Sequence, residues 1–434
     1  MADLIVTNVS VLMKDGHIRP HQDVTITGGI ISAIEDAASS QAGDCRRIDG
    51  QDKLLMPGLA DSHMHTGQQL LKGRVLDELP MIWTRIMLPF ESTLTPELMK
   101  LSAELAALEM ICSGTTAFVD AGSYHMEEAA AVYGQSGLRG LLSASTMDED
   151  GLPASIASTA DEALAMTDRL WDVCQNFPRL KTAYSLRSLI SCSEELIQKV
   201  SCRARERGAL LQAHMNEYPG EINFFLQRKQ LRPAEYLDSL GVLGPHFISA
   251  HSLLLSESEK ELYQKHQVKV CHCPFSNCGK GVPDTPSLLQ KGICVGLGTD
   301  GAAHGGLSLW NEMKIFRSVM NLAYGVPQGN PAIMPASQVI AMATENGYRL
   351  MGEPEGGVIA PGKKADFITL SLRRPHIFPT GNLVNTLLEC VTGGDVQDMV
   401  VDGQVLMENR QVLTLDEERI LFDAENYLRR QNLL

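Results

Sequence analysis

The feature that most constrains this chain is the stretch Pro57–His65, in which two histidines, His63 and His65, are separated by one residue. The apolar run Lys53–Met56 leads into it and is typical of a short buried strand. Side chains alternate across a strand, so His63 and His65 can direct two imidazoles at one point. Such a pair favours a metal ion. Taken alone, it is equally typical of surface histidines at a strand end.

Strand-like runs recur after His65 and alternate with helical patterns, for example residues 95–112, 193–207 and 256–266. The runs lie at residues 116–120, 141–144, 182–186, 210–214, 247–251, 268–272 and 294–300. With the first strand they make eight βα units. The series predicts an α/β protein with a (β/α)₈ TIM barrel.

Both ends of the chain are richer in strands than in helices. Short strand patterns punctuated by glycine fill residues 3–49, and similar patterns return from about Gly357, followed by helical spacing over residues 416–430. Chain ends often lie close together. We therefore predict a small β-sandwich domain formed by residues 1–56 and 357–434, the latter with a terminal helix, around a barrel of residues 57–356.

Titratable residues stand where most of the predicted barrel strands end, which is where barrel enzymes place their chemistry. Three imidazoles and a carboxylate suit Zn²⁺ or Fe²⁺, and a bound water would become a hydroxide nucleophile near neutral pH. His251 and Asp300 could hold or deprotonate that water. Glu217 could shuttle a proton on the substrate side, although a solvated loop carboxylate is the alternative. The strand-end residues are His63, His65, His214, Glu217, His251, His272 and Asp300.

Composition excludes several classes of partner. The formal net charge is −15, from 37 Lys and Arg against 52 Asp and Glu, which argues against nucleic acid or an anionic membrane. No apolar run approaches a membrane span. The segment Met1–Val6 shows no secretory signal, and the ten cysteines have no disulfide rhythm. We expect reduced thiols and a cytoplasmic protein.

Five motifs resemble the amidohydrolase superfamily, in the branch of guanine deaminase, S-adenosylhomocysteine/methylthioadenosine deaminase and s-triazine hydrolases. They are Pro57-Gly58-Leu59-x-Asp61-x-His63-x-His65, His214-x-x-Glu217, Ala250-His251, His272-x-Pro274-x-Ser276-Asn277 and Gly298-Thr299-Asp300-Gly301.

The resemblance implies one metal, Zn²⁺ or alternatively Fe²⁺, with the ligands His63, His65, His214 and Asp300. It also implies that Glu217 shuttles a proton to a ring nitrogen and that His251 orients the hydrolytic water. Binuclear relatives use a carboxylated lysine at the fourth strand end, and the run from Tyr184 to Arg187 has none. Family members are often dimers or larger, so a homodimer or larger homo-oligomer is expected.

Substrate contacts follow from the same resemblance. Guanine deaminases carry a glutamine and an arginine where this chain has Gln68 and Arg187, whereas adenosine-type enzymes carry a histidine in place of Arg187. Glu91 resembles the ribose-binding glutamate of the nucleoside enzymes or caps the following helix. His304 contacts the substrate or only fills its loop. Fixed donors select an oxo-heterocycle.

We therefore expect deamination of a guanine-like oxopurine or a pterin, with release of ammonia. The alternatives are an S-adenosylhomocysteine/methylthioadenosine-type adenosine deaminase and an s-triazine or amidine hydrolase.

Two further interpretations of the sequence are a second zinc site and a role other than catalysis. Cys271-His272-Cys273 with Cys278 could form a second zinc site, but neighbouring residues of a strand face opposite ways, which favours buried thiols. Some relatives have lost their ligands and serve as assembly proteins. Every expected ligand is present here, which favours an enzyme.

Overall fold

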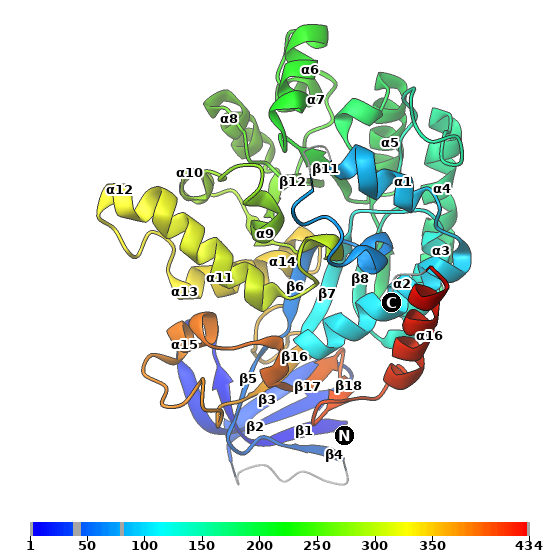
Figure 1. The fold of residues 1–434 in the computed structure, drawn as a ribbon. Coiled ribbons are helices and arrows are strands. Elements are labelled where there is room, and N and C mark those ends of the chain that lie inside the picture. Colours follow the sequence, from blue (N-terminus) through cyan, green and yellow to red (C-terminus); the bar gives the residue numbers. More distant parts are fainter. Residues whose placement is uncertain (1–2, 38–44, 79–81, 432–434) are drawn as a thin grey trace.

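The computed structural model describes residues 3–37, 45–78 and 82–431. A body of parallel strands and helices stands on a smaller sheet whose strands come from both ends of the chain, blue and orange in Figure 1. Among the described residues, no helix is both long and apolar enough to cross a bilayer.

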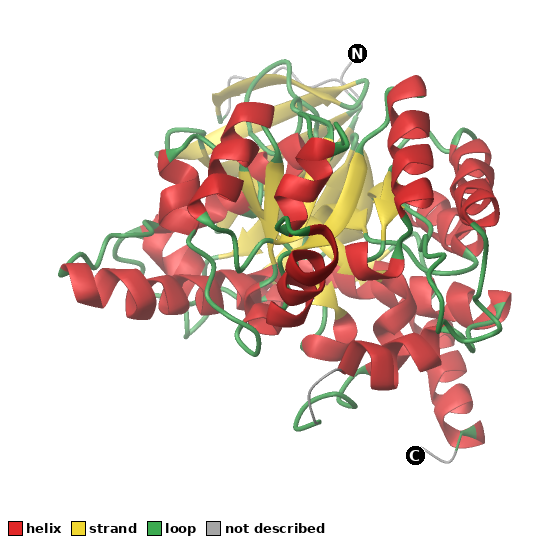
Figure 2. Ribbon diagram, turned by 90° about the horizontal axis from the view of Figure 1, so that it is seen from above, coloured by secondary structure: helices red, strands yellow, loops and turns green. Residues whose placement is uncertain are grey.

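The body contains two five-stranded parallel sheets, with the orders β15-β6-β7-β8-β9 and β10-β11-β12-β13-β14. The chain passes directly between them: only Ala183 separates β9 from β10, and only Gly298 and Thr299 separate β14 from β15. This is the order of a TIM-barrel α/β fold, and Figure 2 shows the strands surrounded by helices. The strands are β6 (Leu59–His65), β7 (Thr115–Asp120), β8 (Arg139–Leu142), β9 (Leu180–Thr182), β10 (Tyr184–Leu186), β11 (Leu211–Met215), β12 (Phe247–His251), β13 (Lys269–His272), β14 (Val295–Leu297) and β15 (Asp300–Gly301).

Helices connect these strands and begin where the sequence supplies caps. The predicted helices near residues 95, 193 and 256 are confirmed, with Thr95, Ser193 and Ser256 accepting backbone hydrogen bonds as N-caps. The longer helices are α2 (Pro96–Ser113), α3 (Met126–Ser136), α4 (Ala160–Cys174), α5 (Glu194–Glu206), α6 (Pro219–Lys229), α7 (Pro233–Ser239), α8 (Glu257–His266), α11 (Leu309–Met320), α13 (Ala336–Met342), α14 (Glu345–Leu350) and α15 (Leu383–Glu389).

The smaller sheet has nine strands and joins the two chain ends, because β16 pairs antiparallel with β5. Since the described strands are linked in one sheet, the β-sandwich stays a prediction. Its strands are β1 (Leu4–Leu12), β2 (Ile18–Thr27), β3 (Ile30–Asp36), β4 (Arg46–Asp49), β5 (Lys53–Pro57), β16 (Phe367–Ser371), β17 (Val396–Val401), β18 (Gln404–Glu408) and β19 (Gln411–Val412).

One difference from the sequence interpretation concerns the run before the histidine pair. Lys53–Met56 belongs to β5 of the smaller sheet, whereas the barrel strand β6 begins at Leu59. Only Gly58 lies between them. Both strands are buried, so hydrophobicity alone does not separate them.

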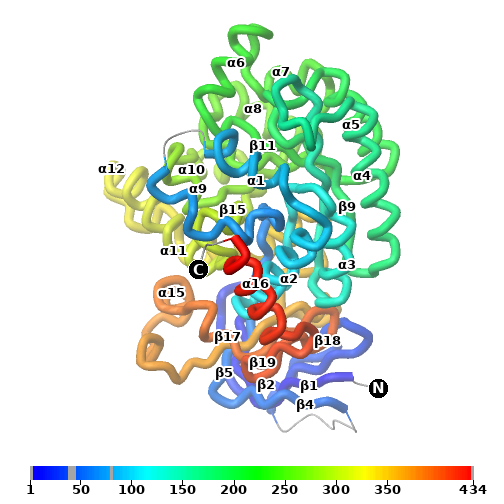
Figure 3. Tube along the Cα trace, turned by 45° about the vertical axis from the view of Figure 1, so that its right-hand side comes forward, coloured from blue at the N-terminus to red at the C-terminus, as the bar shows by residue number. Residues whose placement is uncertain are grey.

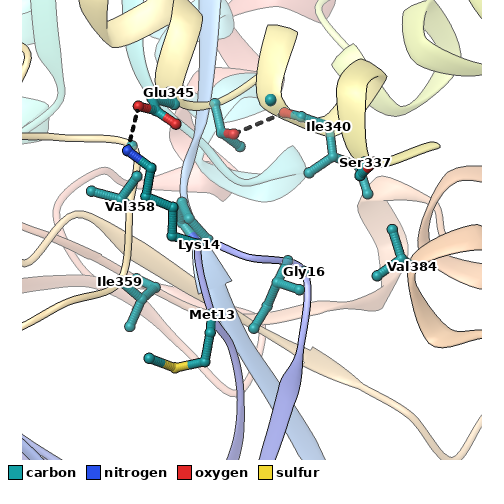
Figure 4. A pocket seen from close by; sticks show the side chains of 14 residues that line it. Met13, Lys14, Gly16, Ser337, Ile340, Glu345, Val358, Ile359 and Val384 are labelled. Atoms are coloured by element: carbon teal, nitrogen blue, oxygen red, sulfur yellow. Dashed lines mark hydrogen bonds and ion pairs between the residues drawn. The ribbon is translucent and has the colours of Figure 1, made fainter. Parts of the chain in front are cut away.

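The terminal helix and a small pocket both lie where the two parts of the structure meet. Helix α16 (Glu417–Arg430), capped by Asp416, packs against α2, as the red helix of Figure 3 shows. Figure 4 shows the pocket between the β1–β2 turn and helices α13 and α14, where Lys14 Nζ lies 3.0 Å from Glu345.

A buried ion pair also joins the two parts. Arg139 of β8 donates two hydrogen bonds to Asp366, at 2.7 and 3.2 Å, and Tyr348 donates a third at 2.9 Å. Both charged groups are almost completely buried.

Replacing Arg139 by methionine leaves Asp366 charged and poorly paired in the interior. We expect a loss of about 3–5 kcal/mol in the free energy of unfolding, measured by denaturant titration. The control is Lys199→Met, which removes an exposed pair with Asp161 and should cost less than about 1 kcal/mol. Equal losses in both variants would contradict the role given to the buried pair.

Candidate active site

Five predicted side chains from four strands meet at the C-terminal ends of the barrel strands. His63 and His65 come from β6, His214 from β11, His251 from β12 and Asp300 from β15. Their ligand atoms form two groups, His63–His65–His214 and His63–His251–Asp300, each with all atoms within 4.8 Å of one another. The structure thus brings these five predicted residues together.

The spacing of these atoms fits a divalent metal. His65 Nε2 lies 3.2 Å from His214 Nε2 and 3.3 Å from Asp300 Oδ1, and His63 Nε2 lies 3.8 Å from the same oxygen. A tetrahedral zinc site with ligands at about 2.0–2.1 Å has ligand atoms about 3.3 Å apart. Within the described residues, neither ring nitrogen of His63 has a hydrogen-bond partner, although the ring is buried. Buried polar atoms of this kind suit a metal ion.

The backbone is strained where it presents these groups. His251 and Asp300 have positive φ angles of 67° and 60°, and non-glycine residues adopt such angles rarely. Gly298 lets the last strand approach β6, since a Cβ there would lie 2.6 Å from the carbonyl oxygen of His63. The fold thus holds both the carboxylate and the imidazoles in fixed positions.

The protonation states also suit metal binding. Burial, together with the neighbouring charged groups, lowers the pKa values of His63 and His214 well below the usual value, so both rings are neutral. Burial by itself would raise the pKa of Asp300, but Lys280 and His65 outweigh it and hold that pKa well below the usual value. Neutral imidazole and ionised carboxylate are the ligand forms.

Glu217 lies beside this cluster. Its Oε1 is 3.5 Å from His251 Nε2 and 2.6 Å from Lys280 Nζ. Burial would raise the pKa of Glu217, but the neighbouring His251 and Lys280 outweigh it and lower the pKa. The carboxylate is therefore ionised and positioned next to the group predicted to orient water.

Sequence reasoning missed Lys280. Its ammonium group also donates to Ser276 Oγ at 2.6 Å and lies 3.6 Å from Asp300, with only 7% of its side chain exposed. Lys280 follows the short helix α9 (Pro274–Asn277), where no periodicity shows which way a side chain points. The one available signal was its nearness to the Ser276-Asn277 motif.

The predicted substrate residues Gln68, Glu91 and Arg187 form one buried network. Gln68 and Arg187 both donate to Glu91 Oε1, at 2.8 and 3.0 Å. Arg187 Nη1 also lies 2.9 Å from His65 Nδ1, on the side of that ring away from the other ligand atoms. Glu91 caps no helix, because Thr95 caps α2 and Glu91 itself lies in α1 (Leu88–Glu91).

Among the described residues, His272, His304 and the cysteines belong to neither of the two groups of ligand atoms. His304 Nε2 is 4.0 Å from Asp300 Oδ2 and lines the active-site cavity. His272 donates through Nδ1 to the carbonyl oxygen of His251 at 2.7 Å. Cys271 and Cys273 are buried, and within the described residues neither belongs to a group of closely spaced ligand atoms. The structure therefore does not support a second zinc site at these cysteines.

The cavity in front of the cluster has a volume of about 240 Å³. Its walls include Trp83, Met87 and Ile190 together with the polar cluster. An apolar pocket with a few convergent polar groups is typical of a small-molecule site. The lining residues also include His65, Gln68, Arg187, His214, Glu217, Tyr218, Glu221, Lys280, Asp300 and His304.

Glu221 on this wall yields a prediction of pH dependence. Burial raises its pKa to about 8, from a usual value of 4.5. Between these values the folded protein keeps a proton that the unfolded chain releases, so this contribution to stability falls as pH rises through about 8. We expect the melting temperature of the wild type to fall more than that of Glu221→Gln between pH 5 and pH 9. If the melting temperatures of the wild type and Glu221→Gln changed in parallel with pH, Glu221 would be ionised throughout this range.

An α/β body that gathers imidazoles and a carboxylate at its strand ends defines, as a class, a metal-dependent hydrolase. The chain belongs to the amidohydrolase family, whose model matches residues 54–406.

Comparison with similar proteins indicates which type of reaction the chain catalyses. The chain is 34% identical to 5'-deoxyadenosine deaminase of Methanosarcina acetivorans, over 98% of this chain and 97% of that protein. It is 33% identical to 5-methylthioadenosine/S-adenosylhomocysteine deaminase of Pelotomaculum thermopropionicum, over 98% of both. A zinc-bound adenosine deaminase from Xanthomonas campestris has the same fold, with a TM-score of 0.92, 26% identity, and coverage of 100% and 99%. The chain is a metal-dependent deaminase of this family, which cleaves carbon–nitrogen bonds by hydrolysis.

Proposed function

We propose that this chain hydrolytically deaminates the purine ring of a 5'-substituted adenosine, releases ammonia, and uses Zn²⁺ held by His63, His65, His214 and Asp300. The observation that carries the proposal is the placement of Glu217 and His251 beside the ligand cluster, 3.5 Å apart. A divalent metal supplies a hydroxide nucleophile near neutral pH.

His251 acts as a hydrogen-bond donor to the attacking oxygen. The side-chain amide of Asn277 is fixed by the backbone of Cys273, and in that orientation its nitrogen donates to His251 Nδ1 at 3.0 Å. Because Nδ1 accepts this hydrogen bond, the ring carries a proton on Nε2, which faces Glu217. His251 therefore holds the water in place and does not remove its proton.

Glu217 is the proton carrier. Its ionised carboxylate takes a proton from the attacking water and gives it to the ring nitrogen next to the carbon under attack. The oxygen adds to that carbon, and the carbon–nitrogen bond to the amino group then breaks. With a second proton, from the added hydroxyl group, the amino group leaves as ammonia and the ring keeps an oxo group.

Two observations favour different substrates. The relatives named as 5'-deoxyadenosine and 5-methylthioadenosine/S-adenosylhomocysteine deaminases favour an adenosine-type substrate. Arg187 and Gln68 line the cavity and favour an oxo-heterocycle such as a guanine-like purine, the first expectation from the sequence. We rank the adenosine-type substrate first because the similarity covers nearly the whole chain.

Ammonia release from a panel of compounds tests this order. The panel contains 5'-deoxyadenosine, 5'-methylthioadenosine, S-adenosylhomocysteine, guanine, a pterin and an s-triazine, each with the zinc-loaded protein. The first proposal requires the highest kcat/KM on an adenosine. A highest value on guanine or the pterin would overturn it in favour of the second candidate.

A further inference from the structure

Lys280 lies between two carboxylates of the active site. Its Nζ is 2.6 Å from Glu217 Oε1 and 3.6 Å from Asp300 Oδ2. Only 7% of the Lys280 side chain and 14% of the Glu217 side chain are exposed. A hydrogen bond between charged groups is shorter than one between neutral groups and about twice as strong. The ammonium group is therefore well placed to hold Glu217.

The position of Lys280 is itself fixed from the cluster of metal ligands. Lys280 Nζ donates a hydrogen bond to Ser276 Oγ at 2.6 Å, and the Ser276 hydroxyl donates to Asp300 Oδ2 at 2.6 Å. The other oxygen of Asp300, Oδ1, is the one that faces the imidazoles of the cluster. A continuous chain of contacts thus runs from the ligand cluster through Ser276 and Lys280 to Glu217.

Lys280 is also the main partner of the Glu217 carboxylate. Among the described residues, it alone donates a hydrogen bond to this carboxylate, and His251 Nε2 lies 3.5 Å away. Both of these groups approach Oε1, so the other carboxylate oxygen, Oε2, is left for proton transfer. Glu217 thus has one oxygen that is held and one that is available.

We infer that Lys280 is the positioning residue of the proton carrier: it holds Glu217 by Oε1 at a fixed place relative to the metal ligands and leaves Oε2 for the attacking water and the ring nitrogen. The inference rests on the proposed function, in which Glu217 moves the proton. Without the ammonium group, the carboxylate can turn away from the reacting atoms. Such a change slows proton transfer but has little effect on substrate binding, and a misplacement of about 1 Å can cost about 100-fold in rate.

Lys280→Met tests the inference, because methionine keeps most of the apolar part of the side chain but cannot donate a hydrogen bond. We expect kcat on the best substrate of the ammonia-release panel to fall by about 10–100-fold, with KM changed less than about threefold. The bound zinc, measured by elemental analysis, should be unchanged, because Asp300 Oδ2 keeps the hydrogen bond from Ser276. The control is Lys265→Met, which changes an exposed lysine of α8 and should behave like the wild type.

A double-mutant cycle separates the positioning of Glu217 from a general structural role. If Lys280 acts through Glu217, adding Lys280→Met to Glu217→Gln should lower kcat less than about twofold further, because the group that it positions can no longer carry a proton. Equal losses in both backgrounds would overturn the inference. A loss of zinc in Lys280→Met would also overturn it, because Lys280 would then act through Asp300. If Lys280→Met does not fold, the same cycle is run with Lys280→Gln, which keeps a polar group on a shorter side chain.

Failure of the proposed function gives a different pattern. Glu217→Gln would then keep an activity close to that of the wild type, and Lys280 would have no proton carrier to position. If Glu217→Gln loses activity and Lys280→Met keeps the kcat of the wild type, only the role of Lys280 is overturned. The identity of the substrate does not affect this comparison, because the cycle uses whichever compound of the panel reacts fastest.

Discussion

Replacing Glu217 by glutamine is expected to lower kcat for deamination by about 10²–10⁴-fold, the contribution of a positioned acid–base group. Glutamine keeps the shape of the side chain, but it cannot take a proton from water and pass it to the ring. Steady-state ammonia release measures the effect, and elemental analysis should show that the bound metal is unchanged.

The control for this variant is Glu206→Gln, which changes an exposed glutamate at the end of α5. It should behave like the wild type. If Glu217→Gln kept activity within about tenfold of the wild type, another residue would have to carry the proton.

Asp300→Asn should reduce both the bound metal and the activity. The carboxylate lies 3.3 Å from His65 Nε2, and asparagine brings no charge to balance a divalent cation. We expect kcat/KM to fall by at least about 10²–10³-fold, as when one group of a preorganised electrostatic site is lost. Zinc added to chelator-treated protein should restore the wild type but not the variant.

The matched control is Asp161→Asn, a change at an exposed aspartate of α4. It should bind zinc and react like the wild type. Full metal occupancy with full activity in Asp300→Asn would exclude this carboxylate as a ligand.

The parts of the site that follow from strand geometry could be predicted from the sequence. Parallel strands end at one face, so His63, His65, His214 and Asp300 had to come together once the βα rhythm was recognised. These residues are far apart in the chain, but their positions depend only on a repeated local pattern. The same rhythm predicted the body of the fold and its capped helices.

What the sequence could not show depends on contacts outside the strands. Lys280 follows a helix of four residues, and its direction depends on the carboxylates that attract it. Arg187 and Glu91 lie 96 residues apart, and nothing local marks them as partners. Each residue was predicted as a substrate contact, and the structure adds that the two are partners in one buried network.

The separation of β5 from β6 was missed for another reason. A single residue, Gly58, divides two buried strands that belong to different sheets, and hydrophobicity continues across it. The change of sheet is determined by pairing with β16, which lies about 300 residues later in the chain.

That junction has a mechanical consequence. The strand that ends in two metal ligands is continuous with one clamped between segments from both chain ends, so the terminal sheet serves as its anchor. Loosening the anchor would displace His63 and His65 together while leaving every ligand in the sequence intact. Substitutions that weaken the pairing of β5 with β1 or β16 are therefore expected to lower the activity, although they change no residue of the active site.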